Sequence, residues 1–207
     1  QYDDVMNVQR EIIYKQRKQV LDGENLSDTI SKMIDTVAEN TVSAYYGDNS
    51  EVNTTALSTE IRNTFGSEVY EATKEFIKEK SKDSAIIIEE LKNQAHTQYL
   101  AKEQEIGNEQ LRELERVVML KVVDQKWMDH IDSMDELKNG IGLRAYGQKD
   151  PVVQYRIEGF DMFDQMVEDI KVDVVKLLLN ARKREGGVTR TEAAKVTGAG
   201  LEDTAIN

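Results

Sequence analysis

The sequence has 207 residues and a net charge of −12, from 39 acidic against 27 basic side chains. This charge argues against nucleic acid as a primary partner, because such binding depends on cations that neutralise phosphates. There is no cysteine, which excludes disulfides and thiolate metal sites. With 32% charged residues and a single proline, the composition favours helices, so we expect an all-α protein.

Helical spacing begins at the N-terminus. Residues 1–21 carry apolar side chains at helical intervals, and Gly23 follows as a helix-ending residue. Ser27 is expected to cap a second helix that runs to about Tyr46. Because no capping residue precedes the first helix, we expect it to begin upstream, in a longer protein.

Two short helices are predicted next, at 55–65 and 67–79, separated by Gly66. From residue 83 to residue 137 the helical pattern is almost unbroken, far longer than the mean helix of about 11–12 residues. Gly107 is the only interruption, so we expect a bend or a domain boundary near it.

Two apolar stripes flank a glycine-rich segment at 139–151, and they predict an antiparallel hairpin because neither stripe can stay in water. The first stripe advances by three and four residues, and the second repeats as heptads over 160–181. We expect the structural core of the hairpin to include Trp127, Ile131, Met134, Phe160, Phe163 and Val167. The complete stripes are Val117, Leu120, Val123, Trp127, Ile131, Met134 and Leu137, then Phe160, Phe163, Val167, Ile170, Val174, Leu177 and Ala181.

The segment between the stripes, "NGIGLRAYGQKDP", is predicted to be the loop at the tip of the hairpin. Asp150 and Pro151 suit the start of the second helix as N-cap and first helical residue. Other side chains of this loop do not help a turn to form, and contact with a partner and local packing both remain open. The candidate contact residues are Leu143, Arg144, Tyr146, Gln148 and Lys149.

No catalytic, cofactor-binding or metal-binding residues are predicted. The glycine-rich motifs that bind phosphates are absent, and His96 and His130 belong to no ligand array. Four aspartates could mimic a carboxylate site, but interleaved lysines favour a solvated helix face. These aspartates are Asp124, Asp129, Asp132 and Asp135.

The stretch "VMLKVVDQKWMDHIDSMDELKNGIGLRAYGQKDP" at 118–151 resembles the C-terminal region of the SecA family, the motors of bacterial preprotein translocation. The stretch "YDDVMNVQREIIYKQRKQVL" at 2–21 resembles the start of that family's long scaffold helix. The resemblance extends to about residue 184. It implies an elongated arrangement of a long scaffold helix, an inserted small helical wing domain and an antiparallel two-helix finger. The implied domains are 1–22 and 108–184 for the helical scaffold, with the finger tip at 139–151, then 23–107 for the helical wing and 185–207 for a flexible tail.

The resemblance also implies a function. The scaffold and finger would couple an ATPase motor, absent from this sequence, to preprotein movement through the SecY channel, and would regulate ATP hydrolysis. Tyr146 matches the finger-tip tyrosine that contacts the preprotein in this family. The fragment itself would bind no cofactor and be inactive alone, since ATP and Mg belong to the parent motor.

The partners implied are the motor and preprotein-crosslinking domains, the SecY channel and the preprotein, and a homodimer is possible in the parent protein. The location implied is cytoplasmic, peripheral at the cytoplasmic face of the cell membrane. An alternative from the residues alone is a free-standing coiled-coil adaptor that dimerises through the 160–181 heptads.

Overall fold

The computed structural model describes residues 2–46, 52–80, 82–144 and 150–182, with the backbone alone for 142–144. These residues form seven α-helices and no strand, which confirms the all-α prediction. The helices are α1 (Tyr2–Leu21), α2 (Ser27–Ser43), α3 (Thr54–Phe65), α4 (Ser67–Glu79), α5 (Ser84–Ile106), α6 (Asn108–Arg144) and α7 (Pro151–Leu179).

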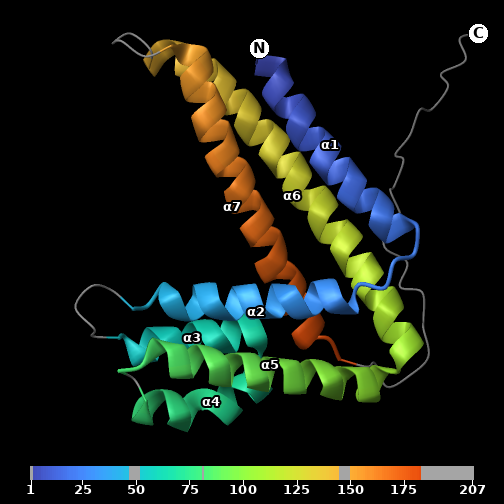
Figure 1. Cartoon of the computed structure of the whole chain (residues 1–207), viewed down its shortest axis with the longest axis vertical. Coiled ribbons are helices and arrows are strands. Elements are labelled where there is room, and N and C mark those ends of the chain that lie inside the picture. The colour runs from blue at the N-terminus through green and yellow to red at the C-terminus, as the bar shows by residue number, and fades with distance from the viewer. Residues whose placement is uncertain (1, 47–51, 81, 145–149, 183–207) are drawn as a thin grey trace, which may run out of the picture.

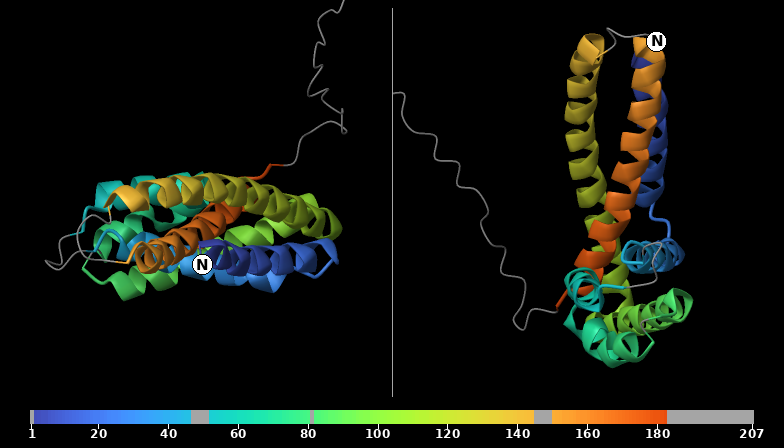
Figure 2. Two further views of the ribbon diagram at one scale, coloured as in Figure 1. Left: turned by 90° about the horizontal axis from the view of Figure 1, so that it is seen from above. Right: turned by 90° about the vertical axis from the view of Figure 1, so that its left-hand side faces the viewer.

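Three long helices, α1, α6 and α7, run together along the long axis of the molecule, while α2 to α5 lie across one end (Figure 1). The antiparallel pair α6 and α7 forms the predicted hairpin, and α1 contacts both of its helices (Figure 2). The lower part of α7 continues between the crosswise helices and contacts α2, α3 and α5. One apolar core therefore extends from the long helices into the crosswise ones.

Three helix ends fall at glycines with a positive φ, a conformation that other residues adopt only with strain. Gly23 (φ +84°) follows α1, Gly66 (φ +96°) separates α3 from α4, and Gly107 (φ +102°) separates α5 from α6. At the start of α7 the Asp150 carboxylate accepts from the Val152 amide at 2.8 Å, with Pro151 in the first turn. These are the boundaries that the sequence predicts.

The start of α2 differs from the prediction. Ser27 is the first helical residue, and the capping position belongs to Leu26, which makes no side-chain cap. Instead the Asn25 side-chain oxygen accepts from the Ser27 amide at 2.9 Å. Ser27 as the cap was therefore wrong, because Leu26 is needed in the core, where it is 6% exposed.

The loop at the hairpin tip begins later than expected. The prediction started it at Asn139, but α6 continues through both following glycines to Arg144. Glycine costs about 1 kcal/mol in a helix, and burial on this turn offsets that cost. Ile141 and Tyr155 are 1% and 2% exposed, and both belong to a small core with Val5, Met134 and Leu137.

The predicted hairpin core is partly rearranged in the structure. Trp127, Met134 and Phe163 are 7%, 1% and 5% exposed, while Ile131 and Val167 are partly buried against the core. Phe160 is 39% exposed, so its assignment to the core was wrong. The buried side of α7 turns one residue earlier, to Gly159, because α7 packs against α1 as well as α6.

One further position of each predicted stripe is also exposed to solvent. Val117 is 51% exposed and Leu177 is 47% exposed, whereas Val118 and Leu178 next to them are buried. Leu178 is buried in place of Leu177 because the last turns of α7 pack among the crosswise helices rather than along α6 alone. With Phe163, Ile170 and Val174 buried inside the chain, the heptads offer no continuous surface for an α7–α7 dimer.

We predict that Trp127→Ala lowers the free energy of unfolding by about 3–5 kcal/mol, the usual cost of truncating a large buried aromatic. The neighbouring Met128 is 64% exposed, so Met128→Ala is a matched control that should change stability by less than about 0.5 kcal/mol. Urea denaturation of both variants measures the difference, and equal effects would show that Trp127 contributes little to the hairpin.

Candidate functional site

Helix α6 ends and α7 begins at the end of the hairpin opposite the crosswise helices (Figure 1). Leu143 and Arg144 form the last backbone positions of α6, and α7 resumes at Pro151. Tyr146, Gln148 and Lys149 lie outside the described residues. The structure therefore describes the ends of α6 and α7 on either side of the predicted tip, and not the side chains of the tip itself.

The hairpin is tied to α1 by one buried amide side chain. Gln9 is 0% exposed although it is polar, and it faces both hairpin helices. Its Nε2 donates to the backbone oxygen of Gly159 on α7 at 2.8 Å. Its Oε1 lies 2.9 Å from Nε2 of His130 on α6. A single side chain therefore links α1 to both arms of the hairpin.

This arrangement determines how each polar group is used. A carbonyl oxygen can only accept, so the NH₂ of Gln9 must face Gly159 and its oxygen must face His130. His130 then has to donate through Nε2, which selects the tautomer with hydrogen on that nitrogen when the ring is neutral. The three groups satisfy one another, as buried polar groups must.

Gly159 allows α7 to come this close. A Cβ placed on it would lie 2.7 Å from Met134 Cε and 3.6 Å from Val5 Cγ1. Any larger residue would push α7 away from α6 and α1, or force Met134 to move. The missing side chain at this position thus brings the backbone oxygen of α7 within reach of Gln9.

Aromatic rings surround the histidine of this network. The His130 ring centroid lies 5.6 Å from Trp127 and 5.7 Å from Phe163, the latter edge-on. His130 is 4% exposed, and burial lowers its pKa from the ordinary value. A cavity of about 320 Å³ reaches it from outside, lined also by Lys126, Asp129 and Asp169.

Half-exposed ion pairs connect the long helices at other levels. Arg17 on α1 pairs with Asp124 on α6 through two contacts of 3.0 and 3.1 Å. Lys126 on α6 pairs with Asp173 on α7 at 2.9 Å, and this hydrogen bond raises the pKa of Lys126. Such accessible pairs each contribute about 0–1 kcal/mol, less than the buried amide network.

A second polar cluster fixes the corner between α5 and α6. The Tyr99 hydroxyl donates to Glu115, which is 0% exposed, and Arg112 reaches Glu115 at 3.3 Å and Glu103 at 2.9 Å. Burial raises the pKa of the Glu115 carboxyl, and burial together with the Glu115 hydrogen bond raises that of Tyr99. The cluster lies beside Gly107, where the chain turns from the crosswise helices into α6.

Several apolar side chains of α1 are exposed, among polar and charged ones. Val8 is 47%, Ile12 is 40% and Tyr14 is 54% exposed, on the same helix whose inner side buries Val5, Gln9 and Ile13. These three exposed positions belong to no core cluster of the described residues.

No group of three or more metal-ligating side chains comes together in the described part of the chain. Asp124 is engaged by Arg17, and Asp129 accepts from Gln125 at 3.0 Å. Among the same residues, no helix is long and apolar enough to cross a membrane.

Sequence reasoning missed Gln9 and the role of His130. One signal was present: Gln9 lies four residues from both Val5 and Ile13, so it occupies a core position of an amphipathic helix. A polar residue at such a position needs partners on the facing helices.

Taken together, the fold and its buried contacts define an elongated helical scaffold with a braced hairpin and a smaller helical unit at its base. The SecA wing and scaffold domain family matches residues 1–182, and the chain belongs to that family.

Curated relatives support the same assignment. The chain is 43% identical over 210 residues to the protein translocase subunit SecA of Clostridium perfringens, a match that covers 96% of this chain and 24% of the relative. It is 45% identical over 200 residues to the SecA subunit of Alkaliphilus oremlandii, covering 94% of this chain and 22% of that protein. The SecA subunit of Clostridium botulinum is 45% identical, with 100% and 25% covered. The chain thus spans about a quarter of the length of these relatives.

We predict that Gln9→Ala lowers the free energy of unfolding by about 1–3 kcal/mol, because it leaves the buried His130 Nε2–H without its acceptor and removes the hydrogen bond to Gly159. The exposed Gln16 on the same helix provides the matched control, and Gln16→Ala should change stability by less than about 0.5 kcal/mol. Chemical denaturation measures both. If Gln9→Ala is as stable as the control, the amide does not hold α1 to the hairpin.

We predict a pH-dependent loss of stability that originates at His130. Its pKa is lowered by folding, so its neutral form contributes fully above the unfolded pKa of about 6.5. As the pH falls from that value through the lower folded pKa, the unfolded state binds more protons and the contribution is lost. His130→Gln can donate the same hydrogen bond but does not titrate. Unfolding free energies between pH 7.5 and pH 5 should therefore fall more steeply for the wild type than for this variant, and parallel curves would contradict the assignment.

Proposed function

We propose that this chain is the scaffold and wing part of a SecA-type protein translocase, in which the α6–α7 hairpin is the two-helix finger. The finger transmits movement from an ATPase motor on other segments to a preprotein in the SecY channel, and it regulates ATP hydrolysis. The observation that carries the proposal is the hairpin itself, held to the scaffold helix α1 by the buried Gln9 amide. The similarity to proteins named protein translocase subunit SecA supports it.

The two sides of α1 suit it to such coupling. The inner side holds Gln9 and Ile13 against the hairpin, while Val8, Ile12 and Tyr14 remain exposed among polar and charged side chains. Exposed apolar side chains of this kind can contact other domains. We assign this contact to the motor and preprotein-crosslinking domains, which lie in the three quarters of the relatives that this chain does not cover. ATP and Mg act in that motor.

The domain division stays a proposal. The scaffold comprises 1–22 and 108–184 and the wing comprises 23–107, while the tail predicted at 185–207 lies outside the described residues. Gly23 and Gly107, at the two scaffold–wing junctions, both have a positive φ, which supports the boundaries. The wing is nevertheless fastened to the finger, because α7 packs against α2 and α3.

The tip of the finger is assigned to substrate and channel contact. Arg144 ends α6 and Pro151 begins α7, both at the end of the hairpin farthest from the wing. A protein with these partners works in the cytoplasm, at the cytoplasmic face of the cell membrane. The proposed contact residues are Leu143, Arg144, Tyr146, Gln148 and Lys149.

We predict that Tyr146→Ala in the full-length protein cuts preprotein transport sharply while changing stability by less than about 0.5 kcal/mol, as is typical of surface positions. A tyrosine side chain has an apolar ring face and a polar hydroxyl, so it contacts many polypeptide sequences. Tyr146→Phe is the matched variant and should retain most transport, because it keeps the ring.

Transport into SecY-containing vesicles and thermal melting measure the two effects separately. Normal transport by Tyr146→Ala would refute the assignment of the tip. A large loss of stability would mean that the ring belongs to the folded core instead.

A further inference from the structure

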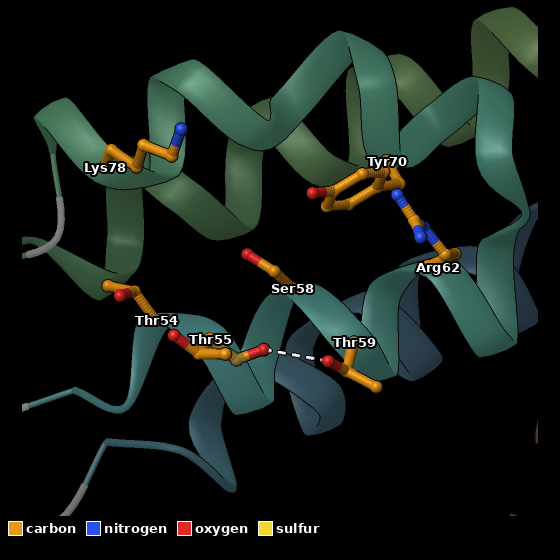
Figure 3. Close-up of a pocket in the computed structure, with 7 residues that line it drawn as sticks. All are labelled: Thr54, Thr55, Ser58, Thr59, Arg62, Tyr70 and Lys78. Atoms are coloured by element: carbon orange, nitrogen blue, oxygen red, sulfur yellow. Dashed lines mark hydrogen bonds between the residues drawn. The ribbon is translucent and has the colours of Figure 1, made fainter.

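A cavity of about 240 Å³ lies between α3 and α4, in the part of the molecule farthest from the hairpin tip (Figure 1). We call it the α3–α4 cavity. Four hydroxyl side chains of α3 line it, and Arg62 on α3 with Tyr70 and Lys78 on α4 complete its wall. In Figure 3 the hydroxyls of Ser58 and Tyr70 both point into the space between the two helices. The four α3 hydroxyls are those of Thr54, Thr55, Ser58 and Thr59.

The functional groups of this cavity are mostly hydrogen-bond donors. Arg62 and Lys78 can only donate, and the hydroxyls of Ser58 and Tyr70 can donate to an acceptor placed between the helices. Among the described residues, no carboxylate lines this cavity, in a protein with a net charge of −12. A ligand with several acceptor oxygens and negative charge is the chemical complement of such a wall.

The Arg62 side chain is held in place before any ligand binds. Its guanidinium carbon lies 4.1 Å from the centre of the Tyr70 ring, in a cation–π contact. Stacking of this kind restricts the guanidinium, so less freedom is lost when an oxyanion binds. The Tyr70 hydroxyl enters the same cavity, so the two groups present their donors together.

Carboxylates outside the cavity compete only weakly for its two cations. Glu71 lies 3.7 Å from Arg62 and is also held by Lys74, and Glu75 lies 3.0 Å from Lys78. These acids are 54% and 69% exposed, and ion pairs this accessible contribute little. An oxyanion that reaches Arg62 and the hydroxyls at once can therefore displace them.

We propose that the α3–α4 cavity binds a phosphate group. A tetrahedral phosphate needs donors from more than one side, and here they come from two helices. The phosphate belongs either to a small soluble phosphate compound or to the headgroup of a phospholipid, since both present the same oxygens. The α3–α4 cavity lies outside the finger, and phosphate binding there does not depend on the proposed coupling function.

The experiment uses the whole chain, labelled with ¹⁵N, in two arms. The first titrates inorganic phosphate against chloride at matched ionic strength and follows the amide signals of α3 and α4. The second measures binding to phosphatidylcholine vesicles with and without phosphatidylglycerol. Saturable binding is expected in at least one arm, and the arm that shows it identifies the source of the phosphate.

Two cavity variants and two matched controls test the location. Arg62→Gln should weaken binding about tenfold and Ser58→Ala about threefold, in line with the loss of hydrogen bonds to a charged group. Arg116 is an arginine on α6 that forms an ion pair with Glu113, so Arg116→Gln removes the same charge away from the cavity. Ser133→Ala on α6 is the control for the hydroxyl. Neither control should change the affinity by more than about twofold, since diffuse surface charge contributes weakly.

Circular dichroism establishes that each variant is folded. If Arg62→Gln does not fold, Ser58→Ala, which keeps all charges, still decides the outcome. The proposal is overturned if neither arm shows binding, if Arg116→Gln weakens binding as much as Arg62→Gln, or if both cavity variants bind like the wild type.

Discussion

The arrangement of the long helices depends on one constraint, that a fully buried amide must have a partner at each end. Gln9 is 0% exposed, so its NH₂ and its oxygen cannot turn to water. Gly159 on α7 and His130 on α6 supply the two partners, at 2.8 and 2.9 Å. Apolar packing alone would tolerate a sliding of α1 along the hairpin. The Gln9 amide does not, because a shift of one turn would leave its NH₂, its oxygen and the His130 Nε2–H without these partners.

The same constraint explains why a glycine lies in the middle of α7. A glycine inside a helix costs about 1 kcal/mol relative to alanine, and Gly159 has no turn to make. Its missing side chain lets α7 approach α6 closely, since a Cβ at this position would lie 2.7 Å from the Met134 side chain. The close approach lets the Gly159 oxygen reach Gln9, and the next residue, Phe160, lies on the exposed side of α7.

Much of the fold was predictable because its boundaries are local. Gly66, Gly107 and the Asp150–Pro151 pair act on their own neighbours, so the sequence is sufficient to place them. The hairpin also followed from local periodicity. The prediction of which side of α7 is buried was wrong. The heptads of 160–181 assumed one partner helix, whereas α7 packs against α6, α1 and the crosswise helices.

The site was less predictable for a related reason. Gln9 and His130 are 121 residues apart, and nothing in either local stretch identifies the other as its partner. The extension of α6 past Gly140 similarly depended on Tyr155, which lies on the other arm of the hairpin. The loop itself pointed to Tyr146 and Lys149 as contact candidates, the family resemblance supplied the role of Tyr146, and these roles remain proposals.

The corner at Gly107 has a mechanical consequence. With a rise of about 1.5 Å per residue, the 37 residues of α6 span about 55 Å. A tilt of about 10° at its base would displace its far end by roughly 10 Å, given that length. Because Gln9 ties α1 and α7 to α6, the three helices would move as one rigid unit. Such a tilt would also have to shift the lower part of α7 against α2, α3 and α5, and the buried Glu115 with its partner Arg112 lies beside Gly107, where a small change in charge or packing would be amplified along the length of α6.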